Sequence, residues 1–227
     1  MSKDKPELTG IGIDSEDFMN SAIKFFSGNR SSEVISDIKN GYRTRPMSTI
    51  CIDDITLWRI APRINWILTK LKNMNHDISI LDAGSWTGAF TNAIYEAGYR
   101  HIECLDLSIN VCKLGRCYFP HLRFINEDIE VYMPKKKYDV VLLCEILEHL
   151  IDPFSTIQSI KKNYLNDNGI ILITIPDDKY VVDDFKQGRF EHIYPINKED
   201  LQKTTIEEIE EIRFSEDYNF YCTSISK

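Results

Sequence analysis

The strongest constraint on the fold is a regular alternation, from residue 77 onward, of short apolar segments with segments of helical periodicity. The sequence predicts strands at 78–84, 101–108, 122–129, 138–147 and 169–177, with helices between them at 88–98, 109–119 and 153–165. Because strands joined by helices run parallel, this series predicts an α/β sheet covered on both faces. The tail, 206–227, predicts two more strands joined by the turn SEDYN. We therefore expect a doubly wound, mostly parallel sheet with an antiparallel last strand.

The first part of the chain follows a different pattern, in which helix signals dominate. Three helices are predicted, at 15–28, 31–42 and 53–73, the last with Pro62 as a kink or first-turn position. Ser15 is the expected first N-cap, and Gly28 and Gly41 are the expected helix stops. We divide the chain into an N-terminal helical cap or lid, residues 1–75, and a domain of residues 76–227. Whether the cap contacts a ligand or only stabilises the sheet edge stays open.

Composition excludes several classes of function. No apolar run approaches the ~20 residues that span a bilayer, and the N-terminus is polar, so we expect a cytoplasmic protein with no membrane partner. The formal net charge of −8 argues against a nucleic-acid partner, because an acidic surface repels phosphates. The six cysteines form no CxxC pair and are expected to be buried, reduced thiols. These features leave the oligomeric state unknown.

Polar residues follow four of the predicted strands. The first carboxyl end is DAGSWTG, 82–88, where glycines allow positive φ and close approach of a ligand to the backbone. The others are Asp106, which can accept both hydroxyls of a ribose, Asp128, which can meet an adenine amino group, and the pair Cys144–Glu145. Ligands of open parallel sheets bind at these ends. The loop does not fit the GxGxxG of dinucleotide sites, and one acid per strand end suits a nucleoside without phosphates.

Over about residues 77 to 227, the chain resembles the class I S-adenosylmethionine-dependent methyltransferases of the small-molecule type. LDAGSWTG is similar to their first motif, LDLS to their ribose motif and NEDI to their adenine motif. YDVVLLCEILEHLIDP and LNDNGIILITIPD are similar to their fourth and fifth strand region. The resemblance implies a Rossmann-like sheet and the cofactor S-adenosylmethionine, with S-adenosylhomocysteine as product. It implies these cofactor-binding residues, from the methionine end through ribose and adenine to the sulfonium: Asp82, Gly84, Ser85, Trp86 and Gly88; Asp106 and Leu107; Asp128 and Ile129; Cys144 and Glu145.

The loop departs from the family pattern at Trp86, where glycine is usual. Positive φ is costly for a tryptophan. We therefore expect either a stiffer loop or a tryptophan that covers the cofactor.

Methyl transfer is a displacement at an activated carbon, so the protein mainly orients the reactants. A general base helps when the acceptor carries a proton. Our catalytic candidates are His149, Glu145 and His192, with His149 as the first choice for the base because histidine titrates near neutrality. The alternative, that His149 only hydrogen-bonds the backbone or Glu148, stays open. If CEILEHLIDP is helical, Glu145, Glu148 and His149 share one face; if it is a loop, they do not.

His192 lies in a segment, 188–201, that in related methyltransferases carries a histidine beside the acceptor pocket, and it is a candidate for substrate contact. Tyr180 and Tyr194 either line the same pocket or simply pack.

The segment 40–54 is expected to be the mobile part of the lid. Tyr42, Arg43 and Arg45 are its possible contacts with an acceptor.

We expect transfer of a methyl group from S-adenosylmethionine to oxygen or nitrogen of a small-molecule metabolite. Two alternatives remain. Glu145, Glu148, His149 and His192 are similar to the metal-binding set of Hen1-type RNA ribose 2′-O-methyltransferases, although we assign no residue to a metal. The other alternative is a non-catalytic domain that binds the cofactor or a protein partner.

Overall fold

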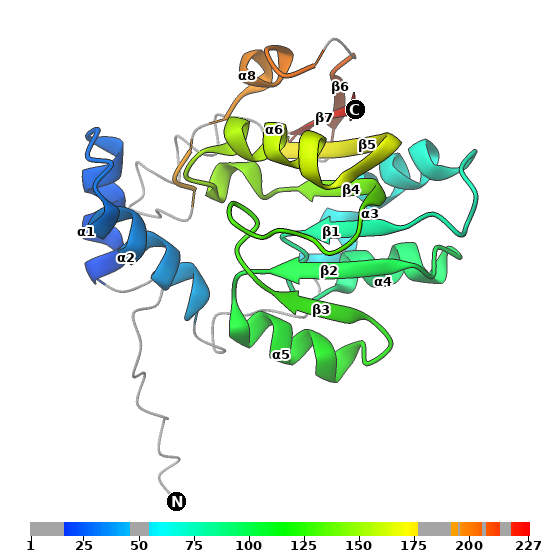
Figure 1. The fold of residues 1–227 in the computed structure, drawn as a ribbon, viewed down its shortest axis with the longest axis horizontal. Helices are drawn as coiled ribbons and strands as arrows, with labels where there is room; N and C mark the ends of the chain where they lie inside the picture. Colours follow the sequence, from blue (N-terminus) through cyan, green and yellow to red (C-terminus); the bar gives the residue numbers. More distant parts are fainter. Residues whose placement is uncertain (1–15, 46–54, 177–191, 195, 206–207, 214–218) are drawn as a thin grey trace, which may run out of the picture.

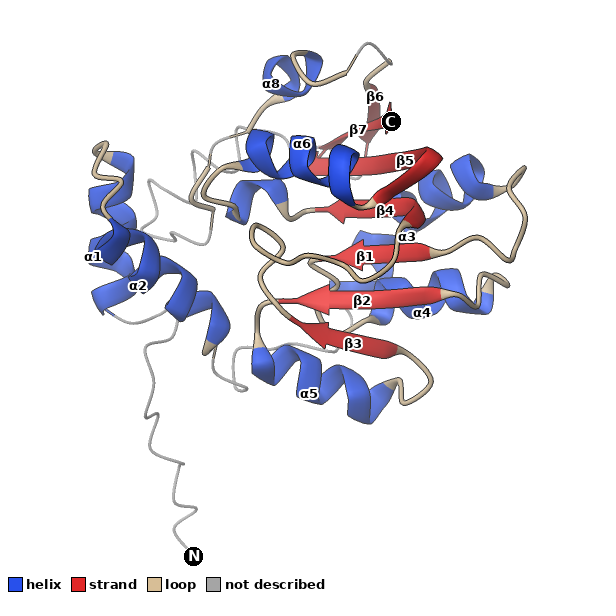
Figure 2. Ribbon diagram, in the orientation of Figure 1, coloured by secondary structure: helices blue, strands red, loops and turns tan. Residues whose placement is uncertain are grey.

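The computed structural model describes residues 16–45, 55–176, 192–194, 196–205, 208–213 and 219–227. These residues form a seven-stranded sheet with helices on both faces (Figure 1 and Figure 2). The strands are β1 Ile80–Ala83, β2 Ile102–Asp106, β3 Arg123–Asn126, β4 Tyr138–Cys144, β5 Leu165–Pro176, β6 Glu210–Arg213 and β7 Asn219–Ser226.

The strands lie in the order β3-β2-β1-β4-β5-β7-β6. β1 pairs in parallel with both β2 and β4, whereas β7 pairs antiparallel with β5 and β6. The predicted doubly wound, mostly parallel sheet with an antiparallel last strand is thereby confirmed. The chain runs outward from β1 to β3 and then returns to β4 on the other side of β1. The strand order therefore reverses between β1 and β4, the place where such sheets bind ligands.

The sheet is buried on both faces, which explains why its strands read as continuous apolar runs. One face packs in a core with α3, α4 and α5 and includes Ile80 and Leu142. The other face packs with α6 and α8 and includes Leu81 and Val141. Successive residues of a strand point to opposite faces, so Asp82 follows Ile80 onto the face of α4. The helices are α3 Ile55–Leu71, α4 Ala89–Glu96, α5 Ile109–Tyr118, α6 Pro153–Asn163 and α8 Lys198–Gln202.

Two further helices, α1 (Glu16–Phe26) and α2 (Ser32–Arg43), lie beside the carboxyl ends of the parallel strands (Figure 1). They have a small core of their own, to which residue 193 of the main body also contributes. Its buried members are Phe18, Phe25, Val34, Ile38 and Ile193. The helical cap is thus formed by α1 and α2, while α3 packs in the core of the sheet. The division of the chain after residue 75 stays a prediction.

The prediction that Gly41 ends the second helix is wrong. α2 continues to Arg43, and Gly41 lies buried inside it. A Cβ at residue 41 would lie 2.4 Å from Cδ2 of Phe18, so the glycine allows close packing of the two helices. Ser15 and residues 46–54 of the expected lid lie outside the described residues.

The segment after β4 also differs from the prediction. The strand expected at 138–147 ends at Cys144, because Glu145 has a φ of 54°. A single 3-10 turn, η2 (Leu147–His149), follows. Glu145 therefore shares no helical face with Glu148 and His149.

A smaller difference concerns the helix expected at 153–165. α6 ends at Asn163, and the NDNG segment that was expected to close it belongs to β5. The pairing of β4 with β5 shifts register there, between Tyr138 and Val140.

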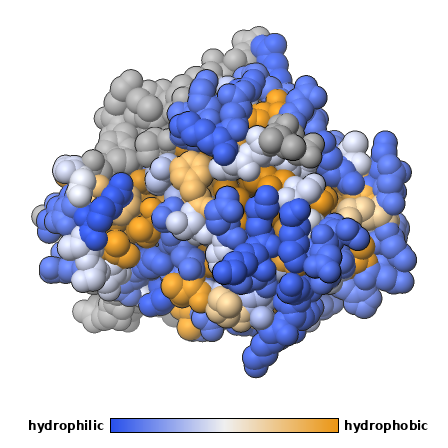
Figure 3. All heavy atoms as spheres, turned by 45° about the horizontal axis from the view of Figure 1, so that its top comes forward, coloured by the Kyte–Doolittle hydropathy of each residue, from blue (hydrophilic) through white to orange (hydrophobic). Residues whose placement is uncertain are grey.

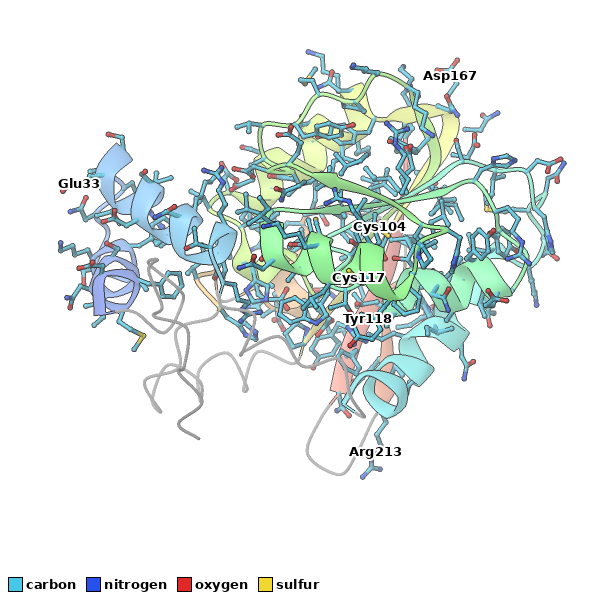
Figure 4. The ribbon with its side chains drawn as sticks, turned by 90° about the horizontal axis from the view of Figure 1, so that it is seen from below. Glu33, Cys104, Cys117, Tyr118, Asp167 and Arg213 are labelled. Atoms are coloured by element: carbon cyan, nitrogen blue, oxygen red, sulfur yellow. The ribbon has the colours of Figure 1, made fainter. Side chains whose placement is uncertain are left out.

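Most of the described cysteines are free and at least partly buried, but Cys117 on α5 is exposed (Figure 4), so the expectation of buried thiols is wrong for it. Hydrophilic side chains cover much of the surface in Figure 3. Among the described helices, none is long and apolar enough to cross a membrane.

We expect Gly41→Ala to lower the free energy of unfolding by about 1–3 kcal/mol, because the new methyl group overlaps the ring of Phe18. This cost exceeds the ~1 kcal/mol that alanine gains over glycine in helix propensity. Urea unfolding followed by circular dichroism measures it. Ser36→Ala, at an exposed position of the same helix, is the control and should change the value by less than about 0.5 kcal/mol. A Gly41→Ala protein as stable as the parent would contradict the packing argument.

Candidate active site

A cavity of about 530 Å³ opens at the carboxyl ends of the central strands. Nearly all residues that the sequence predicts for cofactor binding lie in its wall. They are Asp82, Gly84, Ser85, Trp86, Asp106, Leu107, Asp128, Ile129, Cys144 and Glu145. Gly88 is not among the described wall residues: it precedes α4 with a φ of 83° and packs against the ring of Phe124. The cavity therefore confirms the predicted meeting of the strand ends.

The loop after β1 starts from Asp82, whose buried carboxylate accepts a short hydrogen bond from the Thr91 hydroxyl. Desolvation by burial raises the pKa of Asp82 to about 6, although the hydrogen bond from Thr91 opposes the rise. Gly84 has the predicted positive φ, at 77°. The space beside it, however, is filled by Ile146, which would lie 2.7 Å from a Cβ. Gly84 thus serves a tight turn packed against the segment after β4.

Trp86 adopts a left-handed conformation, with a φ of 51°, despite the cost expected for its side chain. In this conformation its N–H donates to Oδ2 of Asp106 at 3.0 Å, while the N–H of Ser108 donates to Oδ1 at 2.8 Å. The carboxylate at the end of β2 is thereby fixed against the loop after β1. Burial raises the pKa of Asp106 to about 6, although both backbone hydrogen bonds lower it. The Arg45 guanidinium lies over the Trp86 ring, 4.6 Å from its centroid.

The end of β4 carries Glu145 in a left-handed conformation of the kind found at functional sites. Its Oε1 accepts a hydrogen bond from the Thr174 hydroxyl at 3.0 Å and lies 3.8 Å from Nη1 of Arg63. Burial raises the pKa of Glu145, while Arg63 and Thr174 act in the opposite direction. This carboxylate is therefore engaged on one side and faces the cavity on the other.

Arg63, on α3, is a wall residue that the sequence analysis missed. Its side chain is 12% exposed, and its Nε has no hydrogen-bond partner among the residues that the structure describes. The available signal was a cation within an apolar helical stretch, directly after Pro62.

His149, the predicted base, enters the cavity from η2. Its Nδ1 lies 3.4 Å from the hydroxyl oxygen of Tyr42 on α2. The ring of His192 meets it edge-on, with 4.9 Å between centroids and 83° between planes. The structure thus brings both predicted histidines together, and the cap reaches one of them.

The segment that carries His192 is fixed through the backbone carbonyl of Glu148. This oxygen accepts the N–H groups of Ile193 and Tyr194, each at 2.9 Å. The Tyr194 side chain packs against the core of the sheet. Tyr180 lies outside the described residues.

Glu148 itself is 1% exposed, and no described residue hydrogen-bonds its Oε2. Burial and the charge of Glu145 raise its pKa well above its ordinary value. One donor atom from each of Glu148, His149 and His192 lies within 4.8 Å of the others, a set that could hold a divalent cation. Glu145 does not belong to this set.

The cap supplies one side of the wall. Tyr42 and Arg45, predicted as contacts, line the cavity together with Ile38 and Lys39. Arg43, predicted with them, is exposed. Residues 38, 42 and 45 recur at helical spacing, so they face the cavity from one side of the helix.

Comparison with known proteins identifies the kind of domain. A family model described as a methyltransferase domain matches residues 57–222. Among curated proteins, none matches this chain.

Several solved structures are similar. The plantazolicin methyltransferase BpumL, in complex with a pentazolic desmethylPZN analog and SAH, has a TM-score of 0.61 and 12% identity over 92% of this chain and 96% of that chain. Magnesium protoporphyrin IX methyltransferase (ChlM) from Synechocystis PCC 6803, with bound SAH, has a TM-score of 0.60 and 14% identity over 78% and 89%. The N-methyltransferase NodS from Bradyrhizobium japonicum WM9, in complex with SAH, has a TM-score of 0.57 and 16% identity over 78% and 94%. At these identities the likeness shows the fold alone.

We expect Asp82→Asn to stabilise the protein at pH 7.5 by about 1–3 kcal/mol, because one pKa unit corresponds to about 1.4 kcal/mol. The folded protein holds a proton on Asp82 up to about pH 6, whereas the unfolded chain releases it near pH 3.8. Folding stability from this group therefore falls as the pH rises from about 4 to about 6. The asparagine removes this cost, so its advantage should shrink by about half at pH 5.

Urea unfolding at the two pH values measures the effect. Asp77→Asn, at an exposed position, is the control and should change little at either pH. A destabilised Asp82→Asn protein at pH 7.5 would mean that Arg63 and Thr91 compensate the buried charge in full.

Proposed function

Because this chain belongs to the methyltransferase-domain family, within the class I superfamily of S-adenosylmethionine-dependent methyltransferases, we propose that it methylates an oxygen or nitrogen of a small-molecule acceptor. S-adenosylmethionine is the proposed donor. The observation that carries the proposal is the convergence of Asp82, Asp106 and Asp128, from three separate strand ends, in the wall of one cavity.

One end of the cavity suits an amino acid zwitterion. Arg63 offers a guanidinium, and the Ser85 hydroxyl is buried with no hydrogen-bond partner among the described residues. Asp82 and Glu145 supply negative charge in the same wall. We assign Arg63 and Ser85 to the carboxylate of the methionine part of the cofactor, and the two acids to its ammonium group.

The other end suits an adenosine. Each oxygen of Asp106 accepts one backbone N–H and keeps a free lone pair, so the carboxylate can also accept two ribose hydroxyls. Asp128 is assigned to the exocyclic amino group of adenine. Leu107 and Ile129 supply apolar surface beside the base.

When bound, S-adenosylmethionine supplies a methyl group on a positively charged sulfur, which needs no further activation. The residues of the protein orient the acceptor and take its proton. We assign His149 as the general base, oriented by the Tyr42 hydroxyl 3.4 Å from its Nδ1. His192, stacked edge-on against it, is assigned to the acceptor. Glu145 acts through its charge, because Arg63 and Thr174 engage its carboxylate.

The cavity and the charge favour a small acceptor. The volume of about 530 Å³ lies within the range of pockets for small ligands. A net charge of −8 opposes the approach of a phosphate backbone. The comparisons give no support to the alternative of a Hen1-like RNA enzyme.

We expect Asp106→Ala to weaken binding of S-adenosylhomocysteine at least about 10-fold, since two charge-assisted hydrogen bonds are lost. Isothermal titration calorimetry measures it. Because the hydroxyls need the ionised carboxylate, whose pKa burial raises to about 6, the parent protein should also lose affinity as the pH falls from 7.5 to 5. Asp167→Ala, at an exposed position (Figure 4), is the control. Equal affinity of the Asp106→Ala and parent proteins would refute the assignment of the ribose site.

We expect His149→Ala to lower kcat by about 100-fold or more, the usual contribution of a general base, with little change in the affinity for S-adenosylhomocysteine. Tyr42→Phe keeps the ring and removes the hydroxyl, so it should lower kcat by about 3- to 10-fold. His101→Ala, at an exposed histidine, should have no effect. Full activity of His149→Ala on the true acceptor would leave proximity alone as the mechanism.

The acceptor can be found with methyl-labelled donor and fractionated metabolite and RNA pools. We expect the label in a low-mass fraction, and label in RNA would replace the proposed acceptor class. A chelator tests the donor set of Glu148, His149 and His192. Activity lost in EDTA and restored by Mn²⁺ would make these residues metal ligands in place of a free base.

A further inference from the structure

The helix α2 lies across the mouth of the cavity and contacts the main body at separate points. Tyr42 reaches His149, and the carbonyl of Arg45 accepts a hydrogen bond from Nδ2 of Asn110 at 2.9 Å. The strongest contact by distance and charge is made by Lys39. Its Nζ lies 2.6 Å from Oδ2 of Asp128 and 3.0 Å from Oε2 of Glu130.

The main body holds the two carboxylates ready for this lysine. The N–H of Glu130 donates to Oδ1 of Asp128 at 3.0 Å. The N–H of Asp152, which precedes α6, donates to Oε1 of Glu130 at 2.9 Å. Each acid is thus fixed through one oxygen by backbone and offers its other oxygen to Lys39. Without the lysine, two negative groups would face each other at this rim.

The bridge is sheltered from water. The side chains of Lys39, Asp128 and Glu130 are 20%, 9% and 12% exposed. Burial alone would lower the pKa of Lys39, but the hydrogen bonds and charges of the two acids raise it above its ordinary value. Pairs sheltered in this way are less screened than surface pairs.

Lys39 therefore acts on a residue of the proposed adenine site. Asp128 uses one lone pair on each oxygen for Glu130 and Lys39, so lone pairs remain for an amino group. The side chains of Ile38 and Lys39 line the same cavity. When the cap is docked, it both orients this carboxylate and encloses the ligand.

We propose that Lys39 is a positioning residue that couples docking of the helical cap to binding of the adenosine part of the cofactor, through Asp128 and Glu130. The inference rests on the proposed function. Coupling of this kind is reciprocal: if the docked cap tightens cofactor binding, the bound cofactor holds the cap docked by the same factor.

The test is calorimetric titration of the full chain with S-adenosylhomocysteine. Lys39→Met should weaken binding by about 5- to 20-fold, a usual size for coupling between sites, and Lys39→Arg should restore it to within about 2-fold. The matched control is Lys70→Met, because Lys70 makes an ion pair of the same 2.6 Å length, with Glu210, away from the cavity. It should leave the affinity unchanged.

Two further readouts separate coupling from a loss of stability. The affinity for 5′-methylthioadenosine, which lacks the amino acid part, should fall by the same factor in Lys39→Met. In an Asp128→Asn background, Lys39→Met should cost little more, because the carboxylate through which it acts is gone. Hydrogen exchange should show that S-adenosylhomocysteine protects the amides of α2 in the parent and much less in Lys39→Met.

The outcomes are distinct. If the parent protein does not bind S-adenosylhomocysteine, the proposed function is overturned, and this inference with it. If the parent binds and Lys39→Met binds equally well, the proposed function stands and the coupling is overturned. Tighter binding by Lys39→Met would also overturn it, since the lysine would then compete with adenine for Asp128.

Discussion

The parallel pairing of β1 with β2 on one side and β4 on the other is the constraint on which the site depends. Ala83 stands in register with both Leu105 and Leu143, so the residues that follow them emerge side by side at one edge. A shift of one residue would turn Asp82 from the face of α4 to the opposite face of the sheet. The full burial of these strands, with aliphatic side chains on both faces, makes such a shift unfavourable.

The carboxylates at this edge are held mainly by backbone N–H groups, and they are buried before any ligand arrives. Burial of Asp82 and Asp106 raises the pKa of each to about 6, so their charges at neutral pH oppose folding. Left-handed conformations at Trp86 and Glu145 add to this cost. These unfavourable contributions gather where the chain must recognise a charged, polar ligand, and the surrounding apolar core offsets them.

The sequence predicted the parts of the site that depend on local pattern. The strands were readable from their apolar runs, and the acids from their places at the strand ends. Contacts made by distant segments were not readable: Lys39 meets Asp128 across 89 positions of the chain. Gly41 was read as a stop because glycine often ends helices, whereas its role depends on Phe18 in another helix. The turn at Glu145 was left open, since an apolar run does not reveal a single residue with positive φ.

The carbonyl of Glu148 binds the N–H of Ile193, whose side chain lies in the small core of the cap. The turn that carries His149, the segment that carries His192 and the two cap helices are therefore joined mechanically, while the sheet that holds the acids is separate from them. Such a division lets lineages of this enzyme exchange one acceptor for another by remodelling a small helical module, with the donor machinery inherited unchanged.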